Sequence, residues 1–331
     1  NNLVVKDGAN ITSSAISATR VLAGDAGNID IYVTDTLTLS GANPHGQNEN
    51  GLGSGIYARA LGTAEGSGHS GRILLSTNTL NLEDGGVISS ETAGNVVGGD
   101  IEIQAETVRL SGDSSQLEQR LPVKAQIRYK AFLMSIGRAC ETVSNSRVTT
   151  SSIDGAGDAG AIELSAYSLK LTDGAAISSE AETAGGGRIK IGVTDRLYVN
   201  SNSAISASVG DGTGNGGSVQ LSQKFIILDQ GAVTAKAVGG DGGRINISAD
   251  GLFRFPGSTI DASSSLGLDG IININAPDSD VEEHLVVLPT NFLEQGNLSA
   301  AACRIEAFDD RSRYLRQSRA GPHRSPDDWM E

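Results

Sequence analysis

The sequence is poor in aromatic residues, cysteine and proline. Its 331 residues include 1 Trp, 6 Tyr, 6 Phe, 2 Cys and 7 Pro, against 43 Gly. Two cysteines cannot form a framework of disulfides, and no group of Cys and His has the spacing of a zinc site. Because large rings are few and glycine is abundant, the core must be built from small and branched side chains. This composition favours stacked strands over a helical globule.

Basic residues and long apolar segments are also scarce. The chain has 25 Lys and Arg against 39 Asp and Glu, so its formal net charge is −14. Nucleic acid is not expected as a partner, because phosphate binding needs a basic surface. No run of 18 apolar residues occurs, so no membrane span is expected either. Hydrophobic residues still make up 38 % of the chain, which excludes a disordered polar polymer.

What the sequence does contain is a repeat, in which a glycine precedes two alternating aliphatic residues. The motif Gly-x-Ile-x-Ile, with Leu or Val allowed for Ile, recurs eight times, after Gly27, Gly71, Gly99, Gly160, Gly187, Gly217, Gly243 and Gly270. In seven repeats a second apolar pair follows, at Leu37/Leu39, Leu80/Leu82, Val108/Leu110, Leu169/Leu171, Leu197/Val199, Ile226/Leu228 and Phe253/Phe255. A third short apolar stretch follows in turn, at Ile56, Ile88, Val148, Ile177, Ile205, Val233 and Ile260.

Each repeat of about 27 residues therefore predicts three short strands separated by turns rich in Gly, Asp, Asn and Ser. One unit cannot bury its inward face alone, so we expect the units to stack. The sequence predicts an all-β fold, a right-handed parallel β-helix over 1–276 whose apolar pairs point inward, followed by a C-terminal cap or tail over 277–331. A leucine-rich repeat would need a helix-forming stretch in each unit, and a β-propeller would need longer blades of four strands.

Two repeats are longer than the others, because of insertions at about 43–54 and 114–146 at the same corner of the repeat. The second insertion holds five basic residues against Glu118 and Glu141. Its apolar spacing predicts an amphipathic helix with a basic stripe at Arg120, Lys124 and Arg128. The helix either contacts an anionic surface such as acidic polysaccharide, or packs on the acidic repeats without a function of its own.

Asp-Gly pairs recur at one corner of the repeat, at Asp7, Asp84 and Asp173. Stacked carboxylates could suggest calcium binding or acid–base catalysis. The turn interpretation is stronger, because Asp and Gly suit a tight turn and Gly accepts positive φ. We expect no metal, no cofactor and no catalytic residue. Whether Cys140 and Cys303 pair in an oxidising environment stays open.

Several segments, among them GNIDIYVTDTLTLSGA and GRILLSTNTLNLEDGGVISSETAG, resemble the repeats of filamentous-haemagglutinin-like exoproteins. The segment after the last repeat resembles the ending of that family, with Leu285-Val286-Val287-Leu288-Pro289, Asn297-Leu298, Cys303 and Gly321-Pro322. The resemblance implies two-partner secretion through an outer-membrane partner, and adhesion or matrix contact at or beyond the cell surface. Residues 2–12 align with the second and third strands of a repeat. We therefore expect the chain to be the C-terminal part of a longer precursor.

Three functions remain open at this point. The first is a non-catalytic, secreted or cell-surface adhesin-like rod whose loops, above all the two insertions, contact surface glycans or cell-surface proteins. The second is a carbohydrate-active β-helix enzyme of the polysaccharide lyase or hydrolase kind, and the third is a spacer within a larger protein. The outward strand residues vary without aromatic neighbours, which favours a rod over an enzyme. These residues are Asp30, Glu102, Glu163, Lys190, Gln220, Asn246 and Asn273.

Overall fold

The computed structural model describes residues 1–16, 24–41, 53–61, 68–93, 95–112, 145–152, 157–276 and 278–280. The chain divides into two compact units, 1–284 and 285–331, and all the described residues belong to the first. The regular elements of the described residues are β-strands, and none is a helix. The protein is all-β over these residues, as the repeat predicts.

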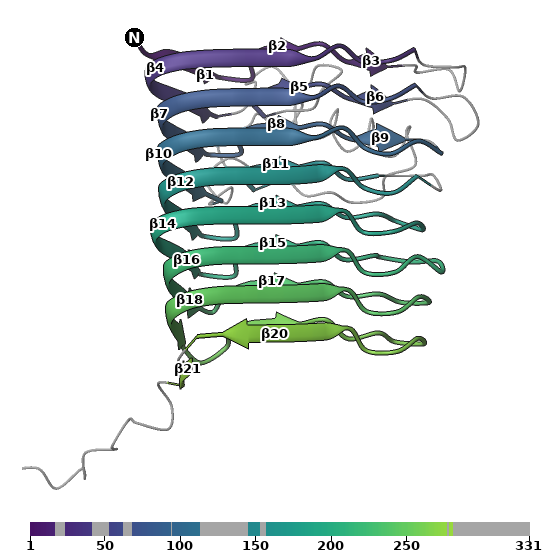
Figure 1. The fold of residues 1–331 in the computed structure, drawn as a ribbon. Helices are drawn as coiled ribbons and strands as arrows, with labels where there is room; N and C mark the ends of the chain where they lie inside the picture. The colour runs from purple at the N-terminus through teal and green to yellow at the C-terminus, as the bar shows by residue number, and fades with distance from the viewer. Residues whose placement is uncertain are drawn as a thin grey trace, which may run out of the picture. The chain divides into compact units, whose positions relative to one another are not determined.

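The strands form three parallel sheets, and within each sheet successive strands follow one another along one common direction (Figure 1). The ten-stranded long sheet contains β1 (Leu3–Lys6), β4 (Ile29–Ser40), β7 (Ile73–Glu83), β10 (Ile101–Ser111), β12 (Ala161–Thr172), β14 (Arg188–Asn200), β16 (Ser218–Asp229), β18 (Arg244–Arg254), β20 (Ile271–Asn275) and β21 (Asp278–Asp280). The eight-stranded short sheet contains β2 (Asn10–Thr12), β5 (Gly55–Tyr57), β8 (Val87–Ser89), β11 (Arg147–Thr149), β13 (Ala176–Ser178), β15 (Ala204–Ser206), β17 (Ala232–Thr234) and β19 (Thr259–Asp261). A third sheet joins β3 (Ala15–Ile16), β6 (Ala60–Leu61) and β9 (Thr92–Ala93).

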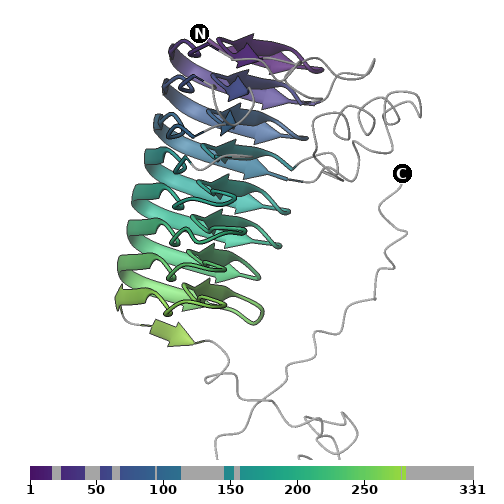
Figure 2. The same cartoon turned by 90° about the vertical axis from the view of Figure 1, so that its right-hand side faces the viewer.

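Each repeat from β1 and β2 to β18 and β19 contributes one strand to the long sheet and one to the short sheet, so strands of the same kind pair between neighbouring repeats. Figure 2 shows the resulting stack from its side. The arrangement is consistent with a β-solenoid. β1 pairs with the second half of β4, and β2 pairs with β5, so residues 2–12 take the places that the sequence alignment predicted for them.

The core consists of aliphatic columns that run through the stack. Ile101, Ile162, Ile189 and Ile245 occupy one register column, with Val219 between the last two, and each is at most 1 % exposed. The predicted inward column is therefore confirmed. Its counterpart in the short sheet runs from Ile11 to Ile260 and is fully buried from Ile56 to Val233. Each buried Ile or Leu side chain contributes about 1.5–3 kcal/mol relative to an exposed one.

One predicted inward pair, Phe253/Phe255, is wrong. Leu252 pairs in register with Ile226 and is fully buried, whereas Phe253 pairs with Ile227 on the outer side and Phe255 is 38 % exposed. The cause is a difference in length within the long strands. β4 and β14 contain a bulge that adds a residue between their two inward pairs, and the pairing of β18 with β16 has no such shift. The inward position in β18 therefore arrives one residue earlier.

Where an Asp-Gly pair occupies the corner between the long and the short strand, it forms a two-residue turn with both residues in the left-handed region. The φ values are 56° and 82° at Asp7 and Gly8, and 59° and 79° at Asp173 and Gly174. Asp84 and Gly85 repeat the pattern. The predicted turn role of the Asp-Gly pairs is confirmed by this geometry, which is that of type I′ turns.

Both predicted insertions lie outside the described residues except for their last two residues each, 53–54 and 145–146. The predicted helix and its basic residues Arg120, Lys124 and Arg128 lie outside the described residues, as do Cys140 and Cys303. The described ends show where the insertions belong. β4 ends at Ser40 and β5 begins at Gly55, while β10 ends at Ser111 and β11 begins at Arg147.

Candidate functional surfaces

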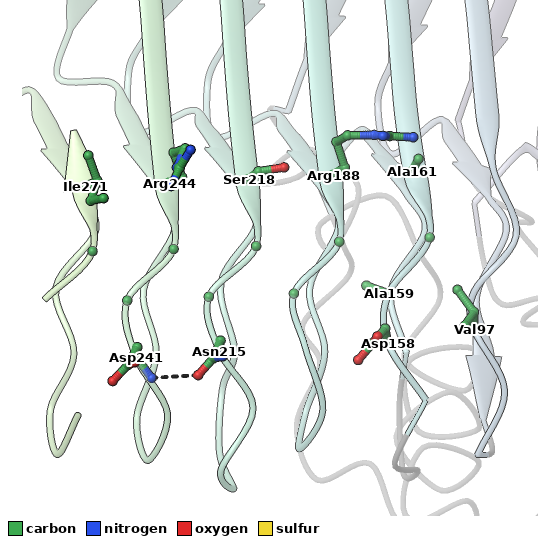
Figure 3. Close-up of a pocket in the computed structure, with 18 of the residues that line it drawn as sticks. Val97, Asp158, Ala159, Ala161, Arg188, Asn215, Ser218, Asp241, Arg244 and Ile271 are labelled. Carbon is green, nitrogen blue, oxygen red and sulfur yellow. Dashed lines mark hydrogen bonds between the residues drawn. The ribbon is translucent and has the colours of Figure 1, made fainter. Parts of the chain in front are cut away.

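An open groove of about 890 Å³ crosses the corner that precedes the long strands (Figure 3). It is lined by the segments that lead into β12, β14, β16, β18 and β20, together with Val97 and Asp100 before β10. Its floor is glycine. A Cβ atom on Gly217 would lie 2.1 Å from the carbonyl oxygen of Gly187, and one on Gly243 would lie 2.0 Å from that of Gly217. Consecutive repeats therefore touch backbone to backbone here, and a side chain has no space.

Acidic and amide side chains line one wall of the groove and join successive repeats. Oδ1 of Asp158 accepts the Gly185 amide at 2.7 Å, and Oδ1 of Asn215 accepts the Asp241 amide at 2.8 Å. Figure 3 shows the Asn215–Asp241 contact between two neighbouring corner loops. Oδ1 of Asp241 in turn accepts the Leu268 amide at 2.9 Å. Each side chain satisfies a backbone donor of the next repeat, so this polar ladder stabilises the stack.

The opposite wall of the groove carries the first residues of the long strands. Arg188, Ser218 and Arg244 are register partners there, and both arginines are exposed. The groove thus places guanidinium groups across from oxygens that accept backbone hydrogen bonds. It is open, and its glycine floor offers a ligand the backbone and little side-chain chemistry.

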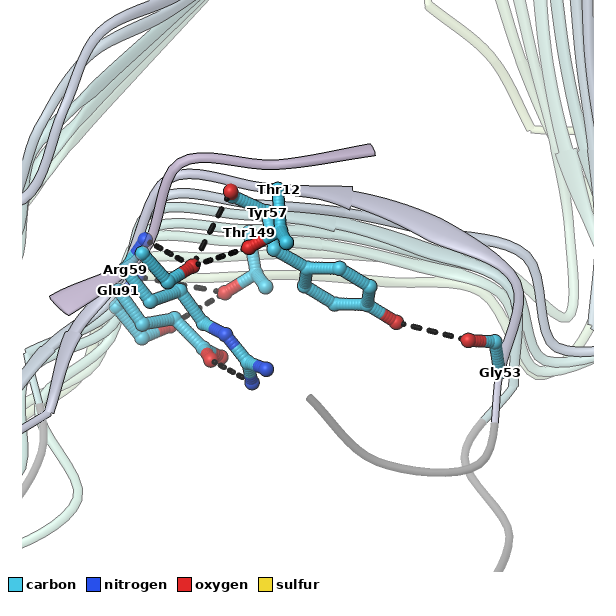
Figure 4. A network of polar contacts seen from close by, with 8 residues as sticks. Thr12, Gly53, Tyr57, Arg59, Glu91 and Thr149 are labelled. Atoms are coloured by element: carbon cyan, nitrogen blue, oxygen red, sulfur yellow. Dashed lines mark hydrogen bonds and ion pairs between the residues drawn. The ribbon is translucent and has the colours of Figure 1, made fainter. Parts of the chain in front are cut away.

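A second polar site lies on the outer side of the short sheet, near β5 and β8 (Figure 4). Nη1 of Arg59 lies 3.5 Å from Oε2 of Glu91, and both side chains are almost fully buried. Cζ of Arg59 lies 4.4 Å from the centroid of the Tyr57 ring, and Oη of Tyr57 donates to the Gly53 carbonyl oxygen at 3.1 Å. An ion pair taken out of water holds its geometry tightly, because either partner alone would be a buried charge. This cluster fixes the outer side of these repeats.

Farther along the same outer side, two carboxyl groups have shifted pKa values. Burial raises the pKa of the Glu180 carboxyl, and a hydrogen bond that Ser206 Oγ donates to it opposes the shift. The hydrogen bond from Lys236 lowers the pKa of Asp261, whose Oδ2 lies 2.7 Å from Lys236 Nζ. The Ser206–Glu180 and Lys236–Asp261 bonds both join neighbouring repeats and belong to the polar surface between them.

The outward residues singled out in the sequence do lie together, in one register column of the long sheet. Glu163 Oε1 and Lys190 Nζ are 2.6 Å apart, and Asn273 Nδ2 donates to Asn246 Oδ1 at 3.0 Å. The column runs Asp30, Leu74, Glu102, Glu163, Lys190, Gln220, Asn246 and Asn273. It lies in the first half of each long strand. Two of its pairs, Glu163 with Lys190 and Asn246 with Asn273, join opposite charges or amides across adjacent repeats, whereas Glu102 and Glu163 are like-charged register partners.

Sequence reasoning missed the second half of the long strands, where aromatic residues do have aromatic neighbours. Tyr198, Ile227 and Phe253 are consecutive register partners on the outer side. Phe225 occupies the adjacent outward column, between Arg196 and Gly251. The sequence signal that could have found this group is the spacing within β18. If the residues after Ile245 are counted as in β16, without an added residue, Phe253 falls on the outer side, beside these residues.

Comparison with known proteins returned no match to a family model, a curated protein or a solved structure. Among the described residues, no helix has the length and apolar character needed to cross a membrane. In the same part of the chain, no three His, Cys, Asp or Glu side chains group as metal ligands would.

Proposed function

We propose that the chain is a non-catalytic, secreted or cell-surface structural protein, an adhesin-like rod similar to filamentous-haemagglutinin-like exoproteins. In this proposal the stacked sheets close into a right-handed parallel β-helix, since crossover connections between parallel strands are right-handed in nearly all proteins. A precursor reaches the cell exterior with the help of an outer-membrane secretion partner. The rod holds contact surfaces away from the cell and needs no cofactor.

The observation that carries the proposal is the use of polar groups along the stack. Oδ1 of Asp158, Asn215 and Asp241 accepts the backbone of the next repeat, and the glycine floor beside them brings backbones into contact. These groups hold neighbouring repeats together along the groove. A regular rod joined in this way transmits force and presents surfaces at fixed intervals, which suits a structural role.

Contact with a partner is proposed at loops of the insertion corner, including the basic stripe Arg120, Lys124 and Arg128. A rigid stack with variable loops is a common way to place binding residues without disturbing the fold. The partner class is a surface glycan or a cell-surface protein. Neither nucleic acid nor a membrane span is part of the proposal, given the net charge of −14.

Fractionation of the producing cells and binding of the labelled chain test this function together. We expect the protein in the medium or on the outer surface, and we expect the purified chain to adhere to cells or matrix at low salt. A parallel screen on polysaccharides should give no new reducing ends and no unsaturated products. Recovery in the cytosol alone would contradict the proposal. Reproducible turnover would favour the carbohydrate-active enzyme instead.

A further inference from the structure

Aromatic residues are concentrated on one outer surface of the stack. Of the seven aromatic residues among the described ones, five lie on or next to the second half of four consecutive long strands, β12 to β18. They are Tyr167, Tyr198, Phe225, Phe253 and Phe255, and we call this surface the aromatic face. Such a concentration is not needed by the core, which is aliphatic throughout.

Two rings of the aromatic face come close together around a glycine. Gly251 stands between Phe225 and Phe253, and a Cβ atom on Gly251 would lie 3.2 Å from an atom of each ring. Gly251 itself is buried, because the two rings lie over it. Tyr198 is in register with Ile227, which is in register with Phe253. The missing side chain at position 251 thus lets rings from adjacent repeats approach one another.

Cations that form no ion pair with a described residue lie near these rings. Arg109 and Lys170 are direct register partners, and like charges in that relation destabilise a sheet. Lys170 Nζ lies 5.8 Å from the centroid of the Tyr198 ring, and Lys224 Nζ lies 5.6 Å from that of Phe225. None of Arg109, Lys170 and Lys224 forms an ion pair with any described residue. Lys190 on β14, by contrast, pairs with Glu163.

We propose that the aromatic face and its bordering cations bind an acidic polysaccharide. Pyranose rings present C–H faces that stack on aromatic side chains, and the carboxylates or sulfates of the polymer neutralise Arg109, Lys170 and Lys224. The face extends across four neighbouring strands, which lie about 4.8 Å apart, so it is long enough to follow an extended chain. This inference rests on the proposed surface-contact function, and it adds a strand face to the loops as a binding surface.

Charge alone does not account for the face. A row of cations would serve any polyanion, and the rest of the acidic stack would repel it. The rings add a requirement for a sugar face, so a polyphosphate should bind much less tightly than a polyuronate. A neutral glucan should also bind weakly, because it leaves the like-charged pair Arg109 and Lys170 without a counterion.

The test is the affinity of the full chain for polygalacturonate, with polyphosphate and dextran as comparison polymers, measured by titration calorimetry. We expect binding of polygalacturonate at low salt that weakens at least about tenfold near 0.5 M salt. The double variant Lys170→Gln/Lys224→Gln should weaken binding about tenfold and flatten its salt dependence. Tyr198→Ala should weaken binding at both salt concentrations, and Tyr167→Ala supplies a second ring variant if Tyr198→Ala unfolds.

Two matched variants control for charge and for ring loss. Lys190→Gln removes a cation that is already paired with Glu163, and Tyr32→Ala removes a ring that is 71 % exposed at the N-terminal end of the stack. Both should bind as the wild type does. Equal binding of polyphosphate, no binding of polygalacturonate, or unchanged affinity in the face variants would overturn the inference.

Two further readouts separate this inference from the proposed function and from self-association. If the face variants still adhere to cells as strongly as the wild type, the face is not the contact surface, and the proposed function survives. If the wild type forms dimers in sedimentation that Tyr198→Ala abolishes, and polygalacturonate does not compete, a second copy occupies the face and the inference is wrong.

Discussion

The N-terminal repeats and the middle repeats have the same kind of interior but differ in where their large outward side chains lie. These side chains lie on the short sheet in the N-terminal repeats and on the long sheet in the middle repeats. On the short sheet, the N-terminal repeats place Tyr57, Arg59 and Glu91 where the middle repeats mostly have serine and threonine, as at Ser206 and Ser208. On the long sheet the distribution is reversed. Small residues occupy the outward positions of β4 and β7 that hold aromatic residues in β14, β16 and β18. The small outward residues of β4 and β7 at these positions are Thr36, Thr38, Thr79 and Asn81.

The difference shows which positions the fold determines. Inward columns hold aliphatic or small residues in both regions, with Gln223 as an exception, because successive repeats leave a fixed space between them. Outward positions are free to differ, so regional differences there point to separate roles. The buried cluster around Arg59 stabilises one region, while the aromatic face of the other is open to a partner.

The largest expected effect comes from the glycine column that both regions share. Gly71→Ala and Gly217→Ala each place a Cβ atom 2.1 Å from a carbonyl oxygen of the preceding repeat. Backbone atoms cannot move aside cheaply, so each variant should lose about 4 kcal/mol or more of stability around its repeat. Hydrogen exchange resolved by strand, together with urea unfolding, measures this.

The matched control is Gly192→Ala, since a Cβ atom there meets nothing within 4 Å. It should leave stability unchanged or raise it by up to about 1 kcal/mol, because alanine is favoured over glycine within strands. Equal losses for Gly192→Ala and Gly217→Ala would show that the tight contact between repeats is not what glycine serves.

The inward column offers a second comparison, between its middle and its last described member. Ile189 is fully buried and Ile272 is 40 % exposed, although both belong to the same column. Ile189→Ala should cost about 3–4 kcal/mol through lost burial and a cavity, and Ile272→Ala about 1 kcal/mol. Denaturant midpoints measure both. Similar costs would mean that the column is equally covered at the two places.

A third comparison sets the buried ion pair against an exposed one. Glu91→Gln removes the carboxylate from the buried pair with Arg59 and should cost about 3 kcal/mol. Glu163→Gln breaks the Lys190 pair, whose side chains are about half exposed, and should cost less than about 1 kcal/mol. Added salt should shrink the second cost and leave the first nearly unchanged. Equal costs would mean that the buried pair on the short sheet stabilises the fold no more than the exposed pair on the long sheet.

The interior could be predicted from the sequence because it repeats. Alternating aliphatic residues after each glycine identified the register columns, and the Asp-Gly pairs identified the turns at Asp7 and Asp173. The exception was β18, where strand length differs by one residue and the repeat spacing alone misassigned Phe253. A single slip exchanges inside and outside, because side chains alternate.

The outer surfaces could not be predicted in the same way. Nothing in the local sequence says that Arg59 meets Glu91, since the two residues belong to different repeats and meet only after stacking. The aromatic face likewise requires the register of four strands, and the role of Gly251 is clear only once the rings of Phe225 and Phe253 are placed. The amphipathic helix predicted for the insertion at 114–146 stays a prediction.

The smallest expected effects are pH effects on the short-sheet side of the middle repeats, and they run in opposite directions. The raised pKa of Glu180 means that the folded state holds this proton more tightly than the unfolded state, whose value is 4.5. The stability contributed by Glu180 is therefore fully present below pH 4.5 and lost as pH rises through the raised folded value. The lowered pKa of Asp261 has the opposite consequence. Its contribution is present above 3.8 and lost as pH falls through the folded value.

Two amide variants separate these contributions. Glu180→Gln keeps an acceptor for Ser206 and should raise the thermal midpoint at neutral pH, with the gain vanishing below pH 4.5. Asp261→Asn removes the charge that faces Lys236 and should lower the midpoint at neutral pH, with the loss shrinking in acid below pH 3.8. Melting curves across the acid range provide the measurement. If both variants shift the midpoint in the same direction at neutral pH, burial does not dominate at Glu180, and the polar contacts between repeats act there as they do at Asp261.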